Sequence, residues 1–311
     1  MSSLRSRLFL FVLRNRHLLH GQLKPRAMID WNTSIDDFRR DVDKSSRLFG
    51  KVPDGIEVSS VDIDGLPAEW IVPTGVAKDK VILYFHGGGY VSGNCRAHRM
   101  HVAKIVKRSN IGALLFEYRL APERPFPSAV YDSLKAYMYL LDQGVAPGRI
   151  AFMGDSAGGG LCLATLLALK DQKIPLPSAA VALSPWTDLA CAGDTYTTNL
   201  DVEPLAPTES WTVFSHYYVG VNNDPQNPYI SPLYGDLLGL PPILIYVGEY
   251  EVMLSDSIRF AEKAENAGVD VTLHVGKGLF HCYPVCAPLF PEATQAMEEI
   301  SDFLNMQTNA S

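Results

Sequence analysis

The stretch that decides the fold runs from Ile150 to Leu161 and reads Ile-Ala-Phe-Met-Gly-Asp-Ser-Ala-Gly-Gly-Gly-Leu. Its first four residues are apolar and predict a buried strand, and the glycines lead into an apolar helix. Between them the sequence fits Gly-x-Ser-x-Gly, in which a sharp strand-to-helix turn presents a serine above the edge of a sheet. Such a turn strains the serine backbone and requires small neighbours. We therefore expect Ser156 to be a nucleophile and Asp155 to brace the turn.

Around this turn, short apolar runs alternate with helical patterns from about residue 57 onward, as is typical of an α/β protein with a largely parallel sheet covered by helices. The sequence predicts strands at 57–63, 68–72, 81–85, 113–118, 150–153, 179–183, 243–247 and 271–275. It predicts helices at 98–108, 128–143, 161–170, 256–267 and 292–304. Residues 1–50 and 190–235 do not follow the alternation, and we expect them to form a helical cap over one end of the sheet.

A second glycine-rich segment, His-Gly-Gly-Gly-Tyr at residues 86–90, directly follows a predicted strand. Nucleophilic attack on a carbonyl places negative charge on its oxygen, and preorganised N–H donors must meet that charge. Glycines leave the backbone amides open to such an approach. The expected oxyanion donors are the amides of Gly88, Gly89 and Ala157. The expected shaping residues of the loop are His86 and Gly87.

A serine nucleophile needs an adjacent base that is itself oriented by a carboxylate. Among the eight histidines, His281 lies in a loop after the predicted strand 271–275, from which it can reach back over the sheet edge. We expect it to be the base. Glu251, in the loop after the preceding strand, is the expected acid. Glu249 and Asp256 stay open as alternatives, and Asp256 is also expected to be the N-cap of the following helix.

Composition excludes some classes of function. The net charge of −7 and the absence of a basic cluster argue against nucleic acid as a partner. Five cysteines, an odd number spread over a long chain, predict free thiols in a reducing, cytoplasmic setting rather than a disulfide framework. The glycine-rich segments fit neither other common pattern, because a dinucleotide fingerprint needs glycine at position 156 and the P-loop triplet Gly-Lys-Ser/Thr does not occur.

The N-terminal run Leu8–Leu13 is apolar and flanked by arginines. It is much shorter than the roughly 20 residues of a membrane span, and small residues of a signal-peptide cleavage site do not follow it. We expect no stable membrane insertion. The run predicts an amphipathic helix that covers an apolar surface, with contact to a membrane surface as the weaker alternative.

Four motifs together have the character of a family signature. They are His-Gly-Gly-Gly at 86–89, Tyr-Arg-Leu-Ala-Pro-Glu at 118–123, Gly-Asp-Ser-Ala-Gly at 154–158 and Ser-Pro-Trp-Thr-Asp at 184–188. From about residue 50 to the end, the chain resembles the hormone-sensitive lipase family of bacterial-type esterases, which have the α/β-hydrolase fold. That family usually carries Asp at the acid position, in Asp-Pro-Leu-x-Asp-Glu. This chain has Glu-Val-Met-Leu-Ser-Asp at 251–256, which places Glu251 there.

The resemblance implies an eight-stranded, mostly parallel sheet with a helical cap. The catalytic core would comprise residues 51–189 and 236–311, and the cap residues 1–50 and 190–235. The implied activity is hydrolysis of a small-molecule ester, with a short- to medium-length acyl chain, through a Ser-His-Glu triad and without metal or cofactor. Family members often pair through the last strand, here Val271–Val275, so the resemblance also implies that a homodimer can form.

Two other functions compete with ester hydrolysis. An enzyme that cleaves amides or lactones could use the same scaffold and the same triad. A non-catalytic receptor is a different class, since the plant gibberellin receptor resembles this family but lacks the catalytic histidine. The presence of His281 together with Ser156 argues against a receptor.

Overall fold

A single sheet of eight strands organises the computed structural model, which describes residues 2–19, 28–46, 51–205 and 210–309. The strand order is β1-β2-β4-β3-β5-β6-β7-β8. β1 pairs antiparallel with β2 and β2 with β4, and the remaining neighbours are parallel. The strands are β1 Ile56–Ile63, β2 Leu66–Pro73, β3 Val81–Phe85, β4 Gly112–Phe116, β5 Ile150–Asp155, β6 Ala179–Leu183, β7 Ile243–Gly248 and β8 Val271–Gly276. The predicted mostly parallel sheet is confirmed.

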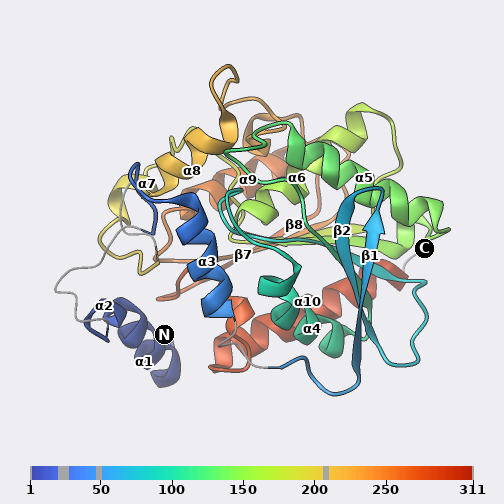
Figure 1. The fold of residues 1–311 in the computed structure, drawn as a ribbon, viewed down its shortest axis with the longest axis horizontal. Helices are drawn as coiled ribbons and strands as arrows, with labels where there is room; N and C mark the ends of the chain where they lie inside the picture. Colours follow the sequence, from blue (N-terminus) through green and yellow to red (C-terminus); the bar gives the residue numbers. More distant parts are fainter. Residues whose placement is uncertain (1, 20–27, 47–50, 206–209, 310–311) are drawn as a thin grey trace.

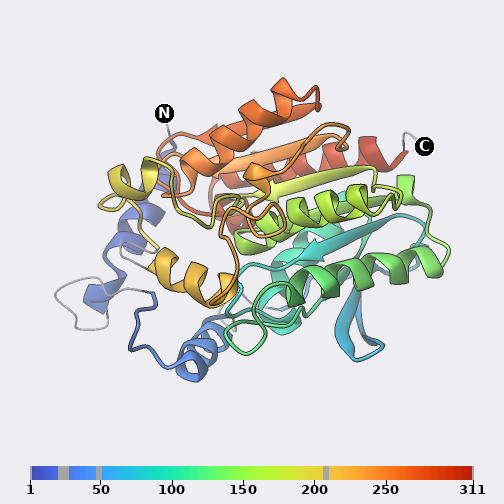
Figure 2. The ribbon, with the colours of Figure 1, turned by 90° about the horizontal axis from the view of Figure 1, so that it is seen from above.

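The central strands lack the alternation of apolar and polar residues because both of their faces are covered. Every residue of β3, β4, β5, β6 and β7 is buried. α4 (Cys95–Ser109) and α10 (Pro291–Asn309) pack on one face. α5 (Ser128–Asp142), α6 (Ala157–Asp171) and α9 (Leu254–Asn266) pack on the other, as Figures 1 and 2 show. All five predicted helices are therefore present, with different ends.

The segments that interrupt the alternation of strands and helices along the chain lie together at one end of the sheet (Figure 1). Ser210 joins them, because its hydroxyl accepts from the amide of Ile29 at 3.1 Å and donates to the carbonyl of the same residue at 2.9 Å. The rings of Phe38 and Phe214 also meet, 5.7 Å apart. The division of the chain into a core and a cap stays a prediction. The helices of these segments are α1 Leu4–Arg14, α2 Arg16–Leu19, α3 Ile35–Ser46, α7 Thr195–Thr198 and α8 Ser210–Val219.

Arg39 of α3 fixes this helix to the segments that follow β3 and β4. Its guanidinium donates to the carbonyl oxygens of Val91 at 2.7 Å and Ala121 at 2.9 Å, and it forms an ion pair with Glu123 at 2.8 Å.

Among the described helices, none has the length and apolar character that crossing a membrane requires.

Candidate active site

The strand-to-helix turn after β5 holds Ser156 in a strained conformation. Its φ of 55° and ψ of −124° lie outside the regions that an L-residue readily adopts. The amide of Ser156 donates to the carbonyl of Leu183 at 2.8 Å, and its own carbonyl accepts from the amides of Gly160 and Trp186, both at 3.1 Å. These bonds fix the serine at the N-terminus of α6.

The glycines of this turn are required because a residue with a Cβ atom would not fit. A Cβ on Gly158 would overlap the carbonyl oxygens of Phe85 and His86, at the end of β3 and the start of the next loop. A Cβ on Gly154 would overlap the carbonyl of Gly158 itself. The turn therefore packs backbone against backbone, which places the loop after β3 directly beside Ser156.

That loop contains two of the three expected oxyanion donors, and the third, Ala157, begins α6. Gly88 and Gly89 have φ of 123° and 64°, values that glycine tolerates and other residues rarely adopt. The amide of Gly87 donates to Oδ1 of Asp155 at 3.1 Å, so Asp155 braces the loop as well as the turn. The ring of His86 stacks on Tyr118 with centroids 4.1 Å apart. Both contacts hold the loop in one shape.

The expected base and acid are in direct contact. Nδ1 of His281 lies 2.7 Å from Oε2 of Glu251, whose side chain is fully buried. The other carboxylate oxygen accepts from the Ser184 hydroxyl at 2.7 Å and from the amide of Gly248. Burial acts to lower the pKa of His281, but Cys282 and the carboxylate of Glu251 raise it well above its usual value.

Ser184, which follows β6, links the acid to the histidine loop. Its hydroxyl accepts from the amide of Cys282 at 2.9 Å while it donates to Glu251. One side chain therefore sets the position of Glu251 and of the residue next to His281.

The two alternative acids point elsewhere. Oδ2 of Asp256 accepts from the amides of Thr187 and Asp188 at 3.1 and 2.9 Å, and Oε2 of Glu249 accepts from the amide of Gly278 at 2.7 Å. The expected N-cap role of Asp256 was wrong, because α9 begins earlier in the chain, at Leu254 after Met253. Burial raises the pKa of Asp256 well above its usual value.

Glu203 was missed by the sequence analysis. Its side chain is 2% exposed and accepts from the amides of Leu205 at 3.0 Å and Val252 at 3.3 Å, so it is tied to the residue after Glu251. Burial raises the pKa of Glu203 to about 7, an effect that His281 opposes and Glu251 increases. The segment Asp-Val-Glu-Pro at 201–204 matches none of the motifs that identified the other site residues.

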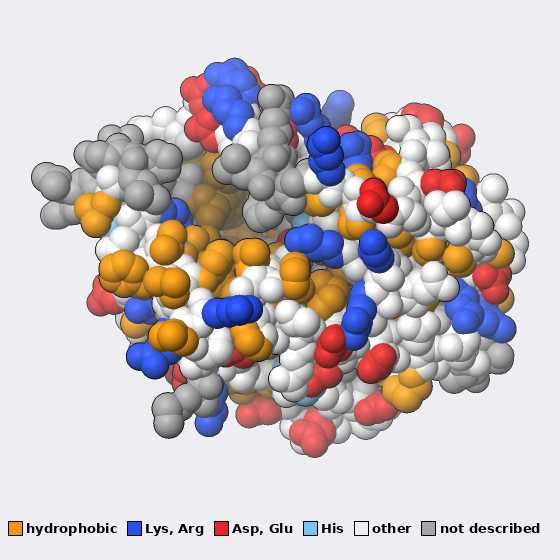
Figure 3. All heavy atoms as spheres, turned by 90° about the horizontal axis from the view of Figure 1, so that it is seen from below, with side chains coloured by type: hydrophobic (Ala, Val, Ile, Leu, Met, Phe, Trp, Pro, Cys, Tyr) orange, Lys and Arg blue, Asp and Glu red, His pale blue; other side chains and the backbone are white. Residues whose placement is uncertain are grey.

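Ser156 and His281 open into the same cavity of about 360 Å³, whose wall also includes the backbone of Gly88 and Gly89. Most of the remaining lining is apolar and comes from α1, α3, the segment around α8 and the loop after β8. Figure 3 shows a hollow on this side of the molecule with hydrophobic side chains around it. The apolar lining includes Phe9, Leu13, Met28, Phe38, Val42, Leu205, Trp211, Phe214, Phe280 and Val285.

Asp155 also belongs to a buried polar network behind the nucleophile. The Tyr84 hydroxyl donates to Oδ1 of Asp155 at 2.8 Å and lies 3.1 Å from Nε2 of His101. Burial, followed by the neighbouring His98, lowers the pKa of His101 to about 3, so the neutral ring can donate to Tyr84. Within the described residues, His98, His101 and Asp155 form a group with the ligand types of a metal site. The histidine Nε2 atoms are 3.9 and 4.0 Å from the carboxylate, and the Tyr84 hydroxyl links His101 to Asp155 by hydrogen bonds.

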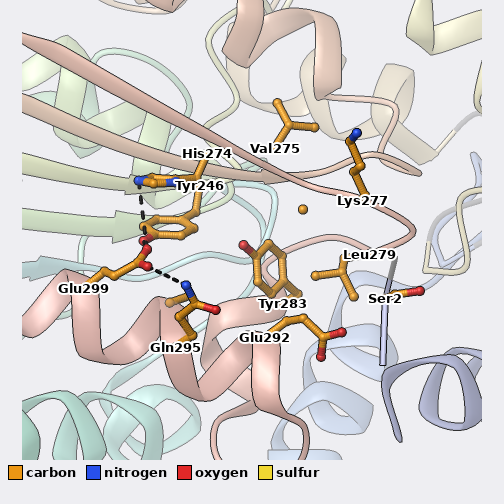
Figure 4. Close-up of a pocket in the computed structure, with 12 residues that line it drawn as sticks. Ser2, Tyr246, His274, Val275, Lys277, Leu279, Tyr283, Glu292, Gln295 and Glu299 are labelled. Carbon is orange, nitrogen blue, oxygen red and sulfur yellow. Dashed lines mark hydrogen bonds and ion pairs between the residues drawn. The ribbon is translucent and has the colours of Figure 1, made fainter. Parts of the chain in front are cut away.

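A second hollow, of about 350 Å³, lies beside the edge strand β8 (Figure 4). In it the ring of His274 stacks on Tyr246 at 4.7 Å, and Glu299 accepts from the Tyr246 hydroxyl. Of the described residues that line it, none is among the expected catalytic or oxyanion residues. The cavity at Ser156 is therefore the candidate active site.

Comparison with known proteins identifies the family to which the chain belongs. A family model described as the α/β-hydrolase fold matches residues 82–285. An acetyl-hydrolase of Streptomyces hygroscopicus is 38% identical over 296 residues, which cover 94% of this chain and 93% of that protein. An esterase of Acinetobacter venetianus is 34% identical over 272 residues, with coverage of 88% and 89%.

Solved structures of esterases match the fold of this chain over almost its whole length. An esterase from the bacterial hormone-sensitive lipase family superimposes with a TM-score of 0.89 and 39% identity, covering 99% of both chains. EstE5, from crystals soaked with p-nitrophenyl butyrate, has a TM-score of 0.90 and 37% identity, covering 99% of this chain and all of its own. The chain belongs to the hormone-sensitive lipase family of carboxylic ester hydrolases with the α/β-hydrolase fold.

Proposed function

We propose that the protein is a serine carboxylesterase that hydrolyses short- to medium-chain acyl esters through the triad Ser156–His281–Glu251. The observation that carries the proposal is the contact of 2.7 Å between His281 and a fully buried Glu251, in a cavity that also exposes Ser156 and the glycine loop. A nucleophile, a base and an orienting carboxylate are the parts that acyl transfer requires.

In the first half-reaction, Oγ of Ser156 attacks the ester carbonyl while Nε2 of His281 takes its proton. The amides of Gly88, Gly89 and Ala157 stabilise the oxyanion of the tetrahedral intermediate. When the intermediate collapses, the bond to the alcohol oxygen breaks and His281 returns the proton to the leaving alcohol. The acyl group then remains on Ser156.

In the second half-reaction, water replaces the alcohol. His281 takes a proton from the water as it attacks the acyl-enzyme, and then protonates Oγ of Ser156 as the carboxylic acid departs. Throughout, Glu251 holds Nδ1–H of the ring and offsets the charge of the imidazolium. Ser184 and Gly248 hold this carboxylate in place, because both donate hydrogen bonds to the oxygen that does not face His281.

The preference for short to medium acyl chains rests on the size and lining of the cavity. A volume of about 360 Å³ is at the lower end of small-molecule pockets, and aromatic side chains such as Phe214 and Trp211 close it. Two relatives are consistent with this preference for short acyl chains. One is named an acetyl-hydrolase, and crystals of the other, EstE5, were soaked with a butyrate ester. We also propose a cytoplasmic location, because all five cysteines are free thiols.

The test is a series of p-nitrophenyl esters from acetate to palmitate, with the wild type and Ser156→Ala compared at equal concentration. We expect turnover to be greatest on short chains and to fall by at least about 10⁴-fold in the variant, since loss of the nucleophile leaves little triad chemistry. Equal activity of the two proteins would refute the mechanism. A folded wild type without activity on any chain length would instead favour an amidase, a lactonase or a receptor.

Two isosteric variants test the acid. Glu251→Gln removes the charge that faces His281 and should lower kcat by roughly 10²–10⁴-fold. Asp256→Asn is the matched control, because the Asp256 carboxylate accepts from the amides of Thr187 and Asp188 and an amide oxygen can accept the same hydrogen bonds. We expect Asp256→Asn to stay within about ten-fold of the wild type. The reverse order of the two effects would reassign the acid.

A further inference from the structure

We propose that the outer face of α1 docks reversibly onto an anionic lipid surface. The inference does not depend on the triad, because it concerns a face of the molecule that points away from Ser156. It rests on three features of α1 (Leu4–Arg14): an inner face that is already packed, an outer face that is apolar and exposed, and arginines along both sides of that outer face.

The inner face fixes the helix to the rest of the fold. The ring of Phe9 stacks on Phe280 with centroids 5.5 Å apart, and Leu10 is only 7% exposed. At the start of the helix, the hydroxyls of Ser3 and Ser6 bond to Glu292 of α10 at 2.9 and 3.1 Å. α1 therefore has a defined orientation, and its remaining apolar residues cannot turn inward.

The outer face is unusually apolar for a protein surface. Leu4, Leu8, Phe11 and Val12 are 79%, 63%, 64% and 50% exposed. Their spacing of i, i+4, i+7 and i+8 places them on one stripe of the helix, opposite the packed face. Figure 3, which views the molecule from the side of α1 and α10, shows hydrophobic side chains gathered over the N-terminal helices. A contiguous apolar stripe of this kind indicates a surface that binds something.

The charges beside the stripe identify the partner. At about 100° per residue, Arg5 lies on one flank of the stripe and Arg7 on the other, while Arg14, on the side of Arg7, already donates to the carbonyl of Val202 at 3.0 Å. No Asp or Glu precedes Asp30, although the whole chain has a net charge of −7. An apolar stripe between basic flanks is the pattern of helices that lie in the plane of an anionic membrane interface, where long basic side chains reach the headgroups.

A second copy of this chain fits the same surface poorly. Two such faces brought together would place the arginines of one copy near those of the other, without a carboxylate on either helix to compensate. An anionic bilayer supplies the opposite charge and an apolar layer at once. Because Phe9 and Leu13 line the cavity from the inner side of the same helix, docking would bring that cavity close to the lipid.

The experiment measures co-sedimentation of the full chain with vesicles of phosphatidylcholine alone and of phosphatidylcholine with one quarter phosphatidylglycerol. We expect binding to the anionic vesicles and weakening by salt. Leu8→Gln/Phe11→Gln should reduce the affinity at least about 100-fold, because two apolar side chains no longer enter the interface. Arg5→Gln/Arg7→Gln should reduce it about 25-fold, since each basic residue near such a surface contributes roughly five-fold.

Matched controls carry the same substitutions on other exposed positions: Leu238→Gln for the apolar change and Arg124→Gln/Lys173→Gln for the charge change. They should bind as the wild type does. All variants should keep the wild-type unfolding midpoint and the hydrolysis of a soluble short ester, which separates loss of docking from loss of folding.

Three results would overturn the proposal. The first is a wild type that binds neither vesicle, and the second is equal binding by the α1 variants and their controls. The third is self-association of the wild type that Leu8→Gln/Phe11→Gln abolishes without any vesicle binding, which would assign the stripe to a second copy.

Discussion

Glu203 places a third ionisable group beside the pair Glu251–His281. Its carboxyl accepts from two backbone amides and is almost fully buried, so its charged form loses hydration that the hydrogen bonds only partly replace. This is why its pKa rises to about 7. Glu203 should therefore contribute to the response of the folded protein to pH near neutrality.

The pKa of Glu203 rises from 4.5 to about 7 on folding, so between these pH values the folded protein keeps a proton that the unfolded chain has released. The free energy of unfolding should consequently fall as pH rises through this window, by about 3 kcal/mol from this group. Glu203→Gln should lack that part of the fall. Urea unfolding at pH 5 and pH 8 measures it.

Glu262→Gln is the control for this prediction, because Glu262 is an exposed residue of α9. It should show the same fall as the wild type. If Glu203→Gln also follows the wild type at both pH values, the carboxyl of Glu203 is ionised in the folded protein and the prediction is wrong.

At this scale the sequence could predict residues that belong to motifs and could not predict residues that depend on distant contacts. Ser156 and His281 follow from the strand-to-helix turn and from chain order. The choice between Glu251 and Asp256 depends on backbone amides near Thr187, far away in the sequence, which occupy one carboxylate and leave the other for the histidine. Glu203 has a functional environment only because the fold buries it.

Among the elements, the turn between β5 and α6 is packed too tightly for a larger residue at Gly158. Gly158→Ala would force a Cβ into the carbonyls of Phe85 and His86 at the end of β3. Because β3 pairs with β5, neither of these two strands can move away without disturbing the sheet. We expect a loss of about 3 kcal/mol or more in unfolding free energy and almost complete loss of activity. Thermal unfolding followed by circular dichroism, with ester hydrolysis on the same samples, measures both.

Gly144→Ala separates steric overlap from backbone strain. Gly144 has a φ of 84°, but no atom lies within 4 Å of the position that an added Cβ would occupy. Alanine there should therefore lose only about 1 kcal/mol of unfolding free energy and keep full activity. Similar effects of the two substitutions would show that the turn is not tightly packed.

The strands and the core helices could be predicted because burial on both faces and amphipathic periodicity are properties of local sequence. The ends of helices were less accurate. α4 begins at Cys95, where the side chain of Asn94 accepts from the amide of Ala97 at 2.8 Å, a capping signal that the expected start at residue 98 overlooked. The start of α8 at Ser210 involves packing between segments far apart in the chain, because the Ser210 hydroxyl accepts from the amide of Ile29.

At the scale of the whole molecule, β8 is an open edge of the sheet. Val275 on this strand is 40% exposed, and the hollow in Figure 4 lies beside it. An exposed edge offers unpaired backbone groups to another strand. We expect two copies to pair through β8, and Val275→Lys to shift the sedimentation coefficient from dimer to monomer because like charges would face each other across the interface.

Val221→Lys is the matched control, since this valine is 93% exposed and lies outside the sheet. It should leave the sedimentation coefficient unchanged. A wild-type protein that sediments as a monomer at all concentrations would contradict the pairing.

The reactive groups and the walls of the cavity at Ser156 come from different parts of the chain. Ser156 and His281 follow core strands, whereas Phe9, Phe38 and Phe214 belong to helices outside the sheet. Because these aromatic side chains belong to other segments than the proposed triad, we expect random mutagenesis restricted to them to change which esters are accepted while the proposed catalytic step is retained. The protein is therefore a suitable starting point for laboratory evolution of enantioselectivity.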